Sequence, residues 1–269
     1  MKNTSRAADL HAPYATPSLI LSVSRPLNVQ EQAAAAKQAV ALLIDGKELH
    51  ADAVQTPEQR CLSLYQGFWQ AEPGLPLLLL PPAPPSCSRH GLSLSHLLRS
   101  PDFFEAFLRA ALRASAHVPV IPILPCTHDR KEIACAQRVI DRVTARLLAS
   151  RIPFDETTRF GLCIGTAEGA KSSRALLEEV DLLFLDTARF SHTVPALMPI
   201  LELLEIAVGN ACVLGRMSVV HGPLATDPRA LPHLLAMGAD ALVRPFYNSD
   251  TISDKIHVKS SCKFNDYLL

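Results

Sequence analysis

The chain has 269 residues, enough to bury one sizeable core, and α/β barrels often reach this length as a single domain. Its 26 lysines and arginines balance 26 aspartates and glutamates, which argues against broad binding to nucleic acid or to anionic lipid. The seven cysteines include no CxxC pair, so we expect free thiols in a reducing compartment, the cytoplasm, and no stretch predicts a membrane span.

The first 16 residues are polar and predict a flexible tail ahead of a single domain over residues 17–269. Short apolar runs predict strands over residues 19–23, 40–44, 75–80 and 118–124, within 159–166 and 181–190, and over 213–217 and 241–244. Helical patterns alternate with them over residues 29–39, 56–70, 93–116 (one or two helices), 129–147, 167–180, 195–210 and 228–237. The polar tail from residue 251 carries no pattern that assigns it a structure.

The stretch from Arg159 to Phe190 reads as strand, helix of about a dozen residues, strand, which is a βαβ unit and requires parallel pairing. Eight strand candidates, most followed by a helix, predict a (β/α)8 TIM barrel. Small molecules bind such barrels beyond the carboxyl ends of the strands. We therefore expect the site near Gly165-Thr166 and Thr187-Ala188-Arg189.

Three local patterns carry further expectations. The helix over residues 195–210 has an unusually wide apolar surface, so we expect the C-terminal tail or a second subunit to cover it, and the sequence favours neither. Glu105, Arg109 and Arg113 recur every four residues and predict a solvated helix face. Cys163 and Cys212 fall in or beside expected strands, where buried inert thiols are usual.

Three segments resemble the barrel domain of phosphoenolpyruvate-utilising enzymes, and most closely that of enzyme I of the bacterial sugar phosphotransferase system. They are DETTRFGLCIGTAEGA, EEVDLLFLDTARF and TDPRALPHLLAMGADAL, and the similarity runs colinearly over most of residues 18–248. The resemblance implies a (β/α)8 barrel of the phosphoenolpyruvate/pyruvate type that commonly dimerises.

The resemblance also implies a Mg²⁺ site whose ligands are missing here. Gly165 replaces the glutamate that ends the family's fifth strand, and Ala188-Arg189 replace an Asn-Asp pair whose aspartate binds the metal. Arginines expected after strand three fall on Leu80, Ser93 and His96. The complete set of degenerate family positions is Leu80, Ser93, His96, Gly165, Ala188 and Arg189.

No residue is therefore expected to be catalytic in the family's manner, and no metal or other cofactor is expected. The family's catalytic cysteine falls on Ser218 or His221, depending on where a short insertion is placed. Histidines elsewhere lack paired metal-ligand spacing.

A rebuilt anion site is the open alternative. Arg189, Ser218, His221 and Arg244 all follow or end expected strands, and His221 with Ser218 offers proton transfer. The structural alternative for the same residues is that Arg189 pairs with a nearby acid and that His221 lies in a solvated loop.

The sequence thus predicts a non-catalytic interaction or ligand-sensing protein, a homodimer with a possible protein partner. The alternative is a transferase or lyase acting on phosphoenolpyruvate or a pyruvate-like oxo acid, so whether the chain is an enzyme stays open. The sequence does not indicate the pathway or the partner.

Overall fold

A computed structural model describes residues 17–23, 35, 39–46, 56–69, 75–83 and 92–246. The expected tail over residues 1–16, most of the helix over residues 29–39 and the segment from residue 251 lie outside these described residues. Within them, no helix is long and apolar enough to cross a membrane.

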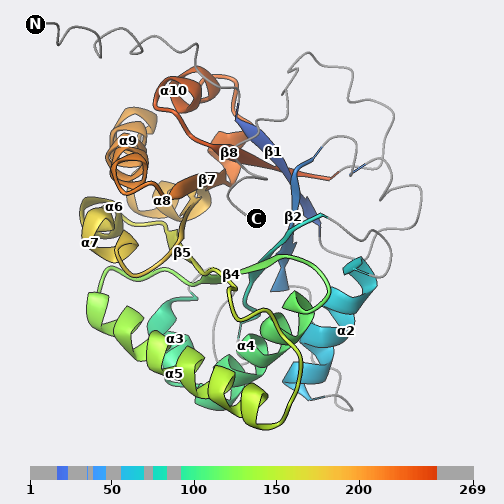
Figure 1. Cartoon of the computed structure of the whole chain (residues 1–269). Helices are drawn as coiled ribbons and strands as arrows, with labels where there is room; N and C mark the ends of the chain where they lie inside the picture. The colour runs from blue at the N-terminus through green and yellow to red at the C-terminus, as the bar shows by residue number, and fades with distance from the viewer. Residues whose placement is uncertain are drawn as a thin grey trace, which may run out of the picture.

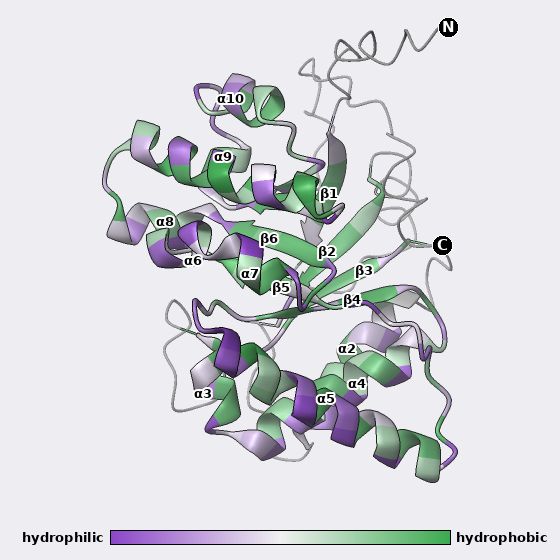
Figure 2. Ribbon diagram, turned by 60° about the vertical axis from the view of Figure 1, so that its left-hand side comes forward, coloured by the Kyte–Doolittle hydropathy of each residue, from purple (hydrophilic) through white to green (hydrophobic). Residues whose placement is uncertain are grey.

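Eight parallel strands close into a barrel in sequence order, with β1 pairing β8 (Figure 1). The strands are β1 Ser18–Val23, β2 Ala41–Asp45, β3 Leu77–Leu80, β4 Val120–Leu124, β5 Gly161–Ile164, β6 Leu182–Asp186, β7 Met217–His221 and β8 Ala241–Pro245. The predicted TIM barrel is confirmed. Its strands are largely hydrophobic (Figure 2), because both faces of each strand are covered.

The described helices pack on the outside of the ring of strands. They are α2 Pro57–Trp69, α3 Leu94–Leu98, α4 Pro101–Ser115, α5 Arg130–Ala149, α6 Ala167–Lys171, α7 Ser173–Leu177, α8 Thr187–Thr193, α9 Leu197–Val213 and α10 Leu231–Ala236, with a 3-10 turn, η2, at Pro223–Ala225. The single helix expected over residues 167–180 is instead two short helices that meet at Ser172. Adjacent serines, which are weak helix formers, mark that break.

The expected position of strand seven, residues 213–217, is wrong, because β7 spans Met217–His221. Helix α9 continues to Val213 and ends at Gly215, whose φ of +66° suits glycine. The Gly215 N–H donates to the Cys212 carbonyl, and the Arg216 N–H donates to the Ala211 carbonyl. This is a Schellman motif, so the apolar run before Gly215 is the last turn of a helix.

Side chains alternate along each strand between the barrel interior and the surrounding helices. Phe184, Val219 and Val243 belong to the interior cluster, whereas Leu183, Val220 and Leu242 pack with the helices. This alternation determines which residues at the strand ends face the mouth of the barrel.

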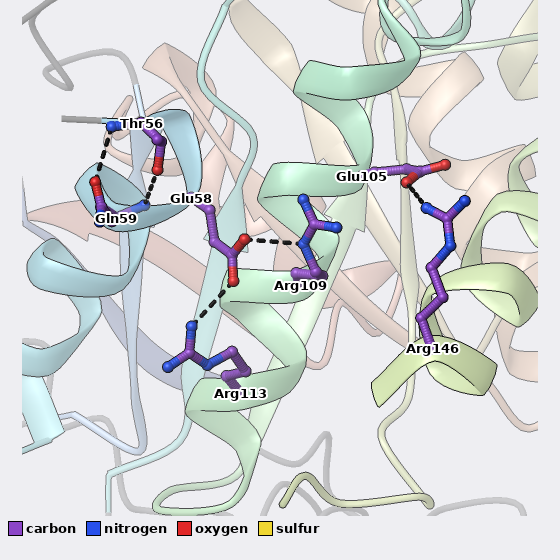
Figure 3. A network of polar contacts seen from close by, with 7 residues as sticks. All are labelled: Thr56, Glu58, Gln59, Glu105, Arg109, Arg113 and Arg146. Carbon is purple, nitrogen blue, oxygen red and sulfur yellow. Dashed lines mark hydrogen bonds and ion pairs between the residues drawn. The ribbon is translucent and has the colours of Figure 1, made fainter. Parts of the chain in front are cut away.

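Helices α2, α4 and α5 are joined by two carboxylates on different helices (Figure 3). Glu58 of α2 accepts hydrogen bonds from Arg109 and Arg113 of α4, at 2.9 and 3.0 Å. Glu105, which is only 8% exposed, accepts from Arg142 and Arg146 of α5. The expected solvated face on α4 is therefore wrong for Glu105, because neighbouring helices cover it.

We predict that Glu105→Gln lowers the free energy of unfolding by about 1–2 kcal/mol, since a buried carboxylate loses charge-assisted bonds to two half-exposed arginines. Urea unfolding measures the change. The control is Glu178→Gln, whose exposed ion pair with Arg130 spans 3.4 Å and should leave the midpoint unchanged. An unchanged midpoint for Glu105→Gln would contradict the prediction.

Candidate functional site

A pocket of about 170 Å³ opens at the carboxyl end of the barrel strands. Its polar lining comes from the ends of β2, β6 and β7 and from α8: Asp45, Asp186, Arg189, His192 and His221. The apolar part of the lining consists of Leu80, Pro81, Ala83, Leu92, Pro125, Cys163 and Ala188. The site therefore lies at the carboxyl ends of the strands, where the barrel fold predicts it, and its lining combines groups of both charges with apolar side chains.

Arg189 crosses the mouth from the first turn of α8. Its Nη1 donates to the carbonyl oxygen of Leu92, at 2.5 Å, in the segment that leads into α3. Its aliphatic stem lies against Gly165, because a Cβ built on that glycine would stand 2.7 Å from the Arg189 Cβ and 3.0 Å from its Cδ. Within the described part of the chain, the Arg189 guanidinium thus donates to a backbone carbonyl. It does not form the ion pair with a nearby acid that was one of the two expectations for it.

Asp186 and His221 form an acid and imidazole pair on neighbouring strands. They are register partners at the ends of β6 and β7, and both side chains are 19% exposed. His221 Nδ1 lies 3.8 Å from Asp186 Oδ1, and within the described part of the chain it has no hydrogen-bond partner. The imidazole stacks on Phe184, with ring centroids 5.4 Å apart.

This pair suits proton exchange with a bound ligand, since it sits within the pocket beside Arg189. At 3.8 Å the two groups are too far apart for a hydrogen bond, and they attract each other electrostatically only when the imidazole carries a proton on both nitrogens. Sequence reasoning named His221 and missed Asp186. The alternation of side chains along a strand could have identified Asp186. It lies two residues after Phe184 on the same strand, so both side chains point to the barrel interior.

Ser218 and Arg244 do not join Arg189 and His221. Ser218 is the second residue of β7, buried near the amino end of the barrel, where its Oγ and N–H each donate to Asp240 Oδ2 at 2.9 Å. The expectation that it follows strand seven is wrong because that strand begins later than predicted. Arg244 shares the outward parity of Leu242 and pairs in register with Leu21, whose side chain packs with the helices.

The family positions divide between the pocket and a helix start. Leu80 and Ala188 line the pocket, and Gly165 lies against Arg189. Ser93 and His96 contact each other at the start of α3, where the Ser93 N–H donates to His96 Nδ1 at 3.3 Å and Ser93 Oγ lies 2.6 Å from the same nitrogen. Helix capping accounts for this pair without a ligand.

Among the described residues, no group of three or more histidine, cysteine, aspartate or glutamate side chains is arranged to hold a metal ion.

Two further expectations concern cysteines. Cys163 is buried in β5 as expected, whereas Cys212 is exposed on α9, because the helix continues past the position predicted for it.

The family model described as PEP-utilising enzyme, PEP-binding domain, matches residues 15–189. The chain belongs to this family. The resemblance to the barrel of enzyme I is also confirmed by similarity to the phosphoenolpyruvate-protein phosphotransferases of Buchnera aphidicola subsp. Acyrthosiphon pisum and of Haemophilus influenzae. Each is 28% identical over 154 residues, which are 52% of this chain and 27% of the relative.

The matched part is thus about a quarter of the length of these curated relatives. Solved structures add the fold alone. An HpcH/HpaI aldolase from Desulfitobacterium hafniense superposes with a TM-score of 0.55 at 13% identity, covering 86% of this chain and 87% of that one. An HpcH/HpaI aldolase/citrate lyase family protein from Burkholderia cenocepacia gives 0.58 at 14% identity, covering 85% and 88%.

We predict that Gly165→Ala destabilises this barrel by about 1–3 kcal/mol, because the added Cβ has no room beside Arg189. The cost should fall in an Arg189→Gly background, which removes the Cβ, Cγ and Cδ atoms that the added Cβ would meet. Thermal and urea unfolding measure both effects.

Gly209→Ala is the matched control, since nothing lies within 4 Å of its added Cβ and the residue is inside α9. It should stabilise the protein by up to about 1 kcal/mol. Equal costs for Gly165→Ala with and without Arg189 would show that the arginine stem does not occupy this space.

Proposed function

We propose that this protein is a cytoplasmic, non-catalytic member of the PEP-utilising family, retained to sense a small anionic ligand or to bind a protein partner. The observation that carries the proposal is the packing of Arg189, in the first turn of α8 after β6, against Gly165, directly after β5. By the family resemblance, both positions belong to metal ligands.

The physical reason is charge. Phosphoenolpyruvate chemistry in this family uses Mg²⁺ bound by carboxylates, together with arginines that neutralise phosphate and enolate charge. A guanidinium carries its charge permanently and has no lone pair for Mg²⁺. Loss of a single oxyanion-type donor already costs about a hundredfold or more in rate. Losing metal ligands and several arginines together removes the family's reaction.

The pocket retains a feature that a sensor would use. Arg189 brings a fixed positive charge to a lining that also holds Asp45 and Asp186 among apolar groups, and its bond to Leu92 holds it across the mouth. A small carboxylate or phosphate compound matches this charge without a metal.

The second candidate is an enzyme with a rebuilt site, a transferase or lyase acting on phosphoenolpyruvate or a pyruvate-like oxo acid. The observation that favours it is the Asp186–His221 pair in the same pocket as Arg189. In this version Arg189 would hold the anion and His221 would move a proton. Ser218 and Arg244 take no part.

We predict that the native protein binds oxalate or phosphoenolpyruvate with the same affinity with and without Mg²⁺, and turns over neither phosphoenolpyruvate nor pyruvate. Titration calorimetry and a coupled pyruvate assay measure this. The double variant Gly165→Glu/Arg189→Asp places two carboxylates at the family's positions; once the chain shifts enough to separate the two Cβ atoms, its oxalate binding should become dependent on Mg²⁺.

Circular dichroism checks that the double variant is folded. Turnover in the native protein with Mg²⁺ would overturn the proposal. Turnover without Mg²⁺ that falls at least tenfold in Arg189→Gln, and not in the outward-facing control Arg244→Gln, would establish the second candidate instead.

We propose in addition that the protein forms a homodimer through α9. Met198, Ile206 and Val213 of this helix are 55%, 46% and 71% exposed, a surface that a second copy would cover. The helix is mostly apolar, which supports an interface more than a solvated surface.

We predict that light scattering finds a dimer at micromolar concentration and that Ile206→Glu shifts it to a monomer, because a charge inside an apolar interface lacks a partner. Leu148→Glu on α5, where the native side chain is 49% exposed, is the control and should leave the mass unchanged. A monomeric native protein would remove this proposal.

A further inference from the structure

Two cysteine thiols meet beside the candidate pocket. The Sγ atoms of Cys126, just after β4, and Cys163, in β5, lie 3.0 Å apart. Both residues are 5% exposed and belong to the interior cluster of the barrel. The last register pair of β4 and β5 is Leu124 with Leu162, so Cys163 lies one residue and Cys126 two residues past the point where the sheet holds the two backbones side by side.

Their geometry suits a covalent bond. A disulfide joins sulfur atoms about 2.05 Å apart, so an approach of about 1 Å completes it. The barrel therefore needs no rearrangement of strands to link them. A weak S–H···S hydrogen bond accounts for the same contact in the reduced protein.

We propose that Cys126 and Cys163 form a reversible disulfide in the mouth of the barrel, with hydrogen peroxide as the oxidant. Cys163 lines the pocket, through which so small an oxidant reaches it. Its sulfur attacks one peroxide oxygen, the O–O bond breaks, and a sulfenic acid and a water molecule form. The Cys126 sulfur then attacks the sulfenic sulfur and displaces a second water.

The two steps balance: two thiols lose two electrons and two protons in all, and one peroxide becomes two waters. A small dithiol such as dithiothreitol reverses the reaction by thiol–disulfide exchange. The sequence pattern predicts free thiols in a reducing compartment, so the reduced pair is the resting form and the disulfide is a response to oxidant.

We expect the oxidation of this cysteine pair to be slow. The hydrogen bond with Cys126 and then burial raise the pKa of the Cys163 thiol well above its usual value. Little thiolate is therefore present at neutral pH, and the thiolate is the reactive species. Incubation with peroxide for hours, rather than a rapid-mixing experiment, is the appropriate test.

Backbone contacts connect Cys126 to the segment that holds Arg189. The Cys126 carbonyl accepts the Leu94 N–H at 3.1 Å, and Ser93 forms a parallel bridge with Cys126. The neighbouring Leu92 carbonyl holds Arg189. Oxidation thus fixes the position of the segment on which Arg189 is anchored. An effect on ligand affinity would rest on the proposed function, whereas disulfide formation itself does not.

The experiment treats the native full-length protein with hydrogen peroxide, blocks free thiols under denaturing conditions, and maps linked peptides by mass spectrometry. We expect a peptide pair joined through Cys126 and Cys163 that has lost two hydrogen atoms and disappears with dithiothreitol. Cys126→Ser and Cys163→Ser should each abolish it. Cys212→Ser, which removes an exposed thiol on α9, should retain it.

Thermal unfolding gives a second readout in case one serine variant folds poorly. The bond links residues 37 apart, so oxidation should raise the unfolding midpoint of the native protein by several degrees, and this rise should be absent from both serine variants. Cys126 and Cys163 that stay free while Cys212 is oxidised would overturn the proposal. So would linkage of Cys163 to Cys87 or Cys262 instead. Neither readout depends on Mg²⁺ or phosphoenolpyruvate, so failure here leaves the proposed function untouched.

Discussion

Parallel pairing around a closed ring is the constraint on which the rest of this structure depends. Because β1 pairs β8, each strand has two neighbours and its side chains alternate strictly between the interior and the helices. That parity sends Asp186 and His221 into the mouth and turns Arg244 away from it. A shift of one residue in any strand would exchange these assignments.

The apolar runs in the sequence predict the barrel well, since buried parallel strands read as short hydrophobic stretches. Their limits are harder to predict where a helix ends in equally apolar residues. The stretch around Val213 has strand-like composition, yet the Schellman motif at Gly215 makes it the last turn of α9. Because the predicted strand ended at residue 217, Ser218 was placed at the carboxyl end of the barrel, whereas it lies near the amino end of β7.

The candidate site was predictable in part. Arg189 and His221 could be named because they follow or end strands, and barrel sites lie at the carboxyl ends. The contact between Gly165 and Arg189 was not predictable. It depends on how closely two residues that follow different strands pack against each other in space. The same holds for Cys126 with Cys163 and for Glu105 with α5, since linear sequence does not record which side chains meet.

Gly165 and Arg189 are coupled through close packing of their atoms. A Cβ at position 165 would stand 2.7 Å from the Arg189 Cβ and 3.0 Å from its Cδ, so a side chain at 165 would meet both the start and the stem of the Arg189 side chain. The observed pair fills the space with aliphatic carbon and anchors the guanidinium on Leu92, on the far side of the mouth. Under the proposed function, a cation held by covalent attachment occupies the region where the resemblance places a diffusible one. In that proposal, such a group keeps the attraction for anions and gives up the Lewis acidity on which the family's chemistry depends.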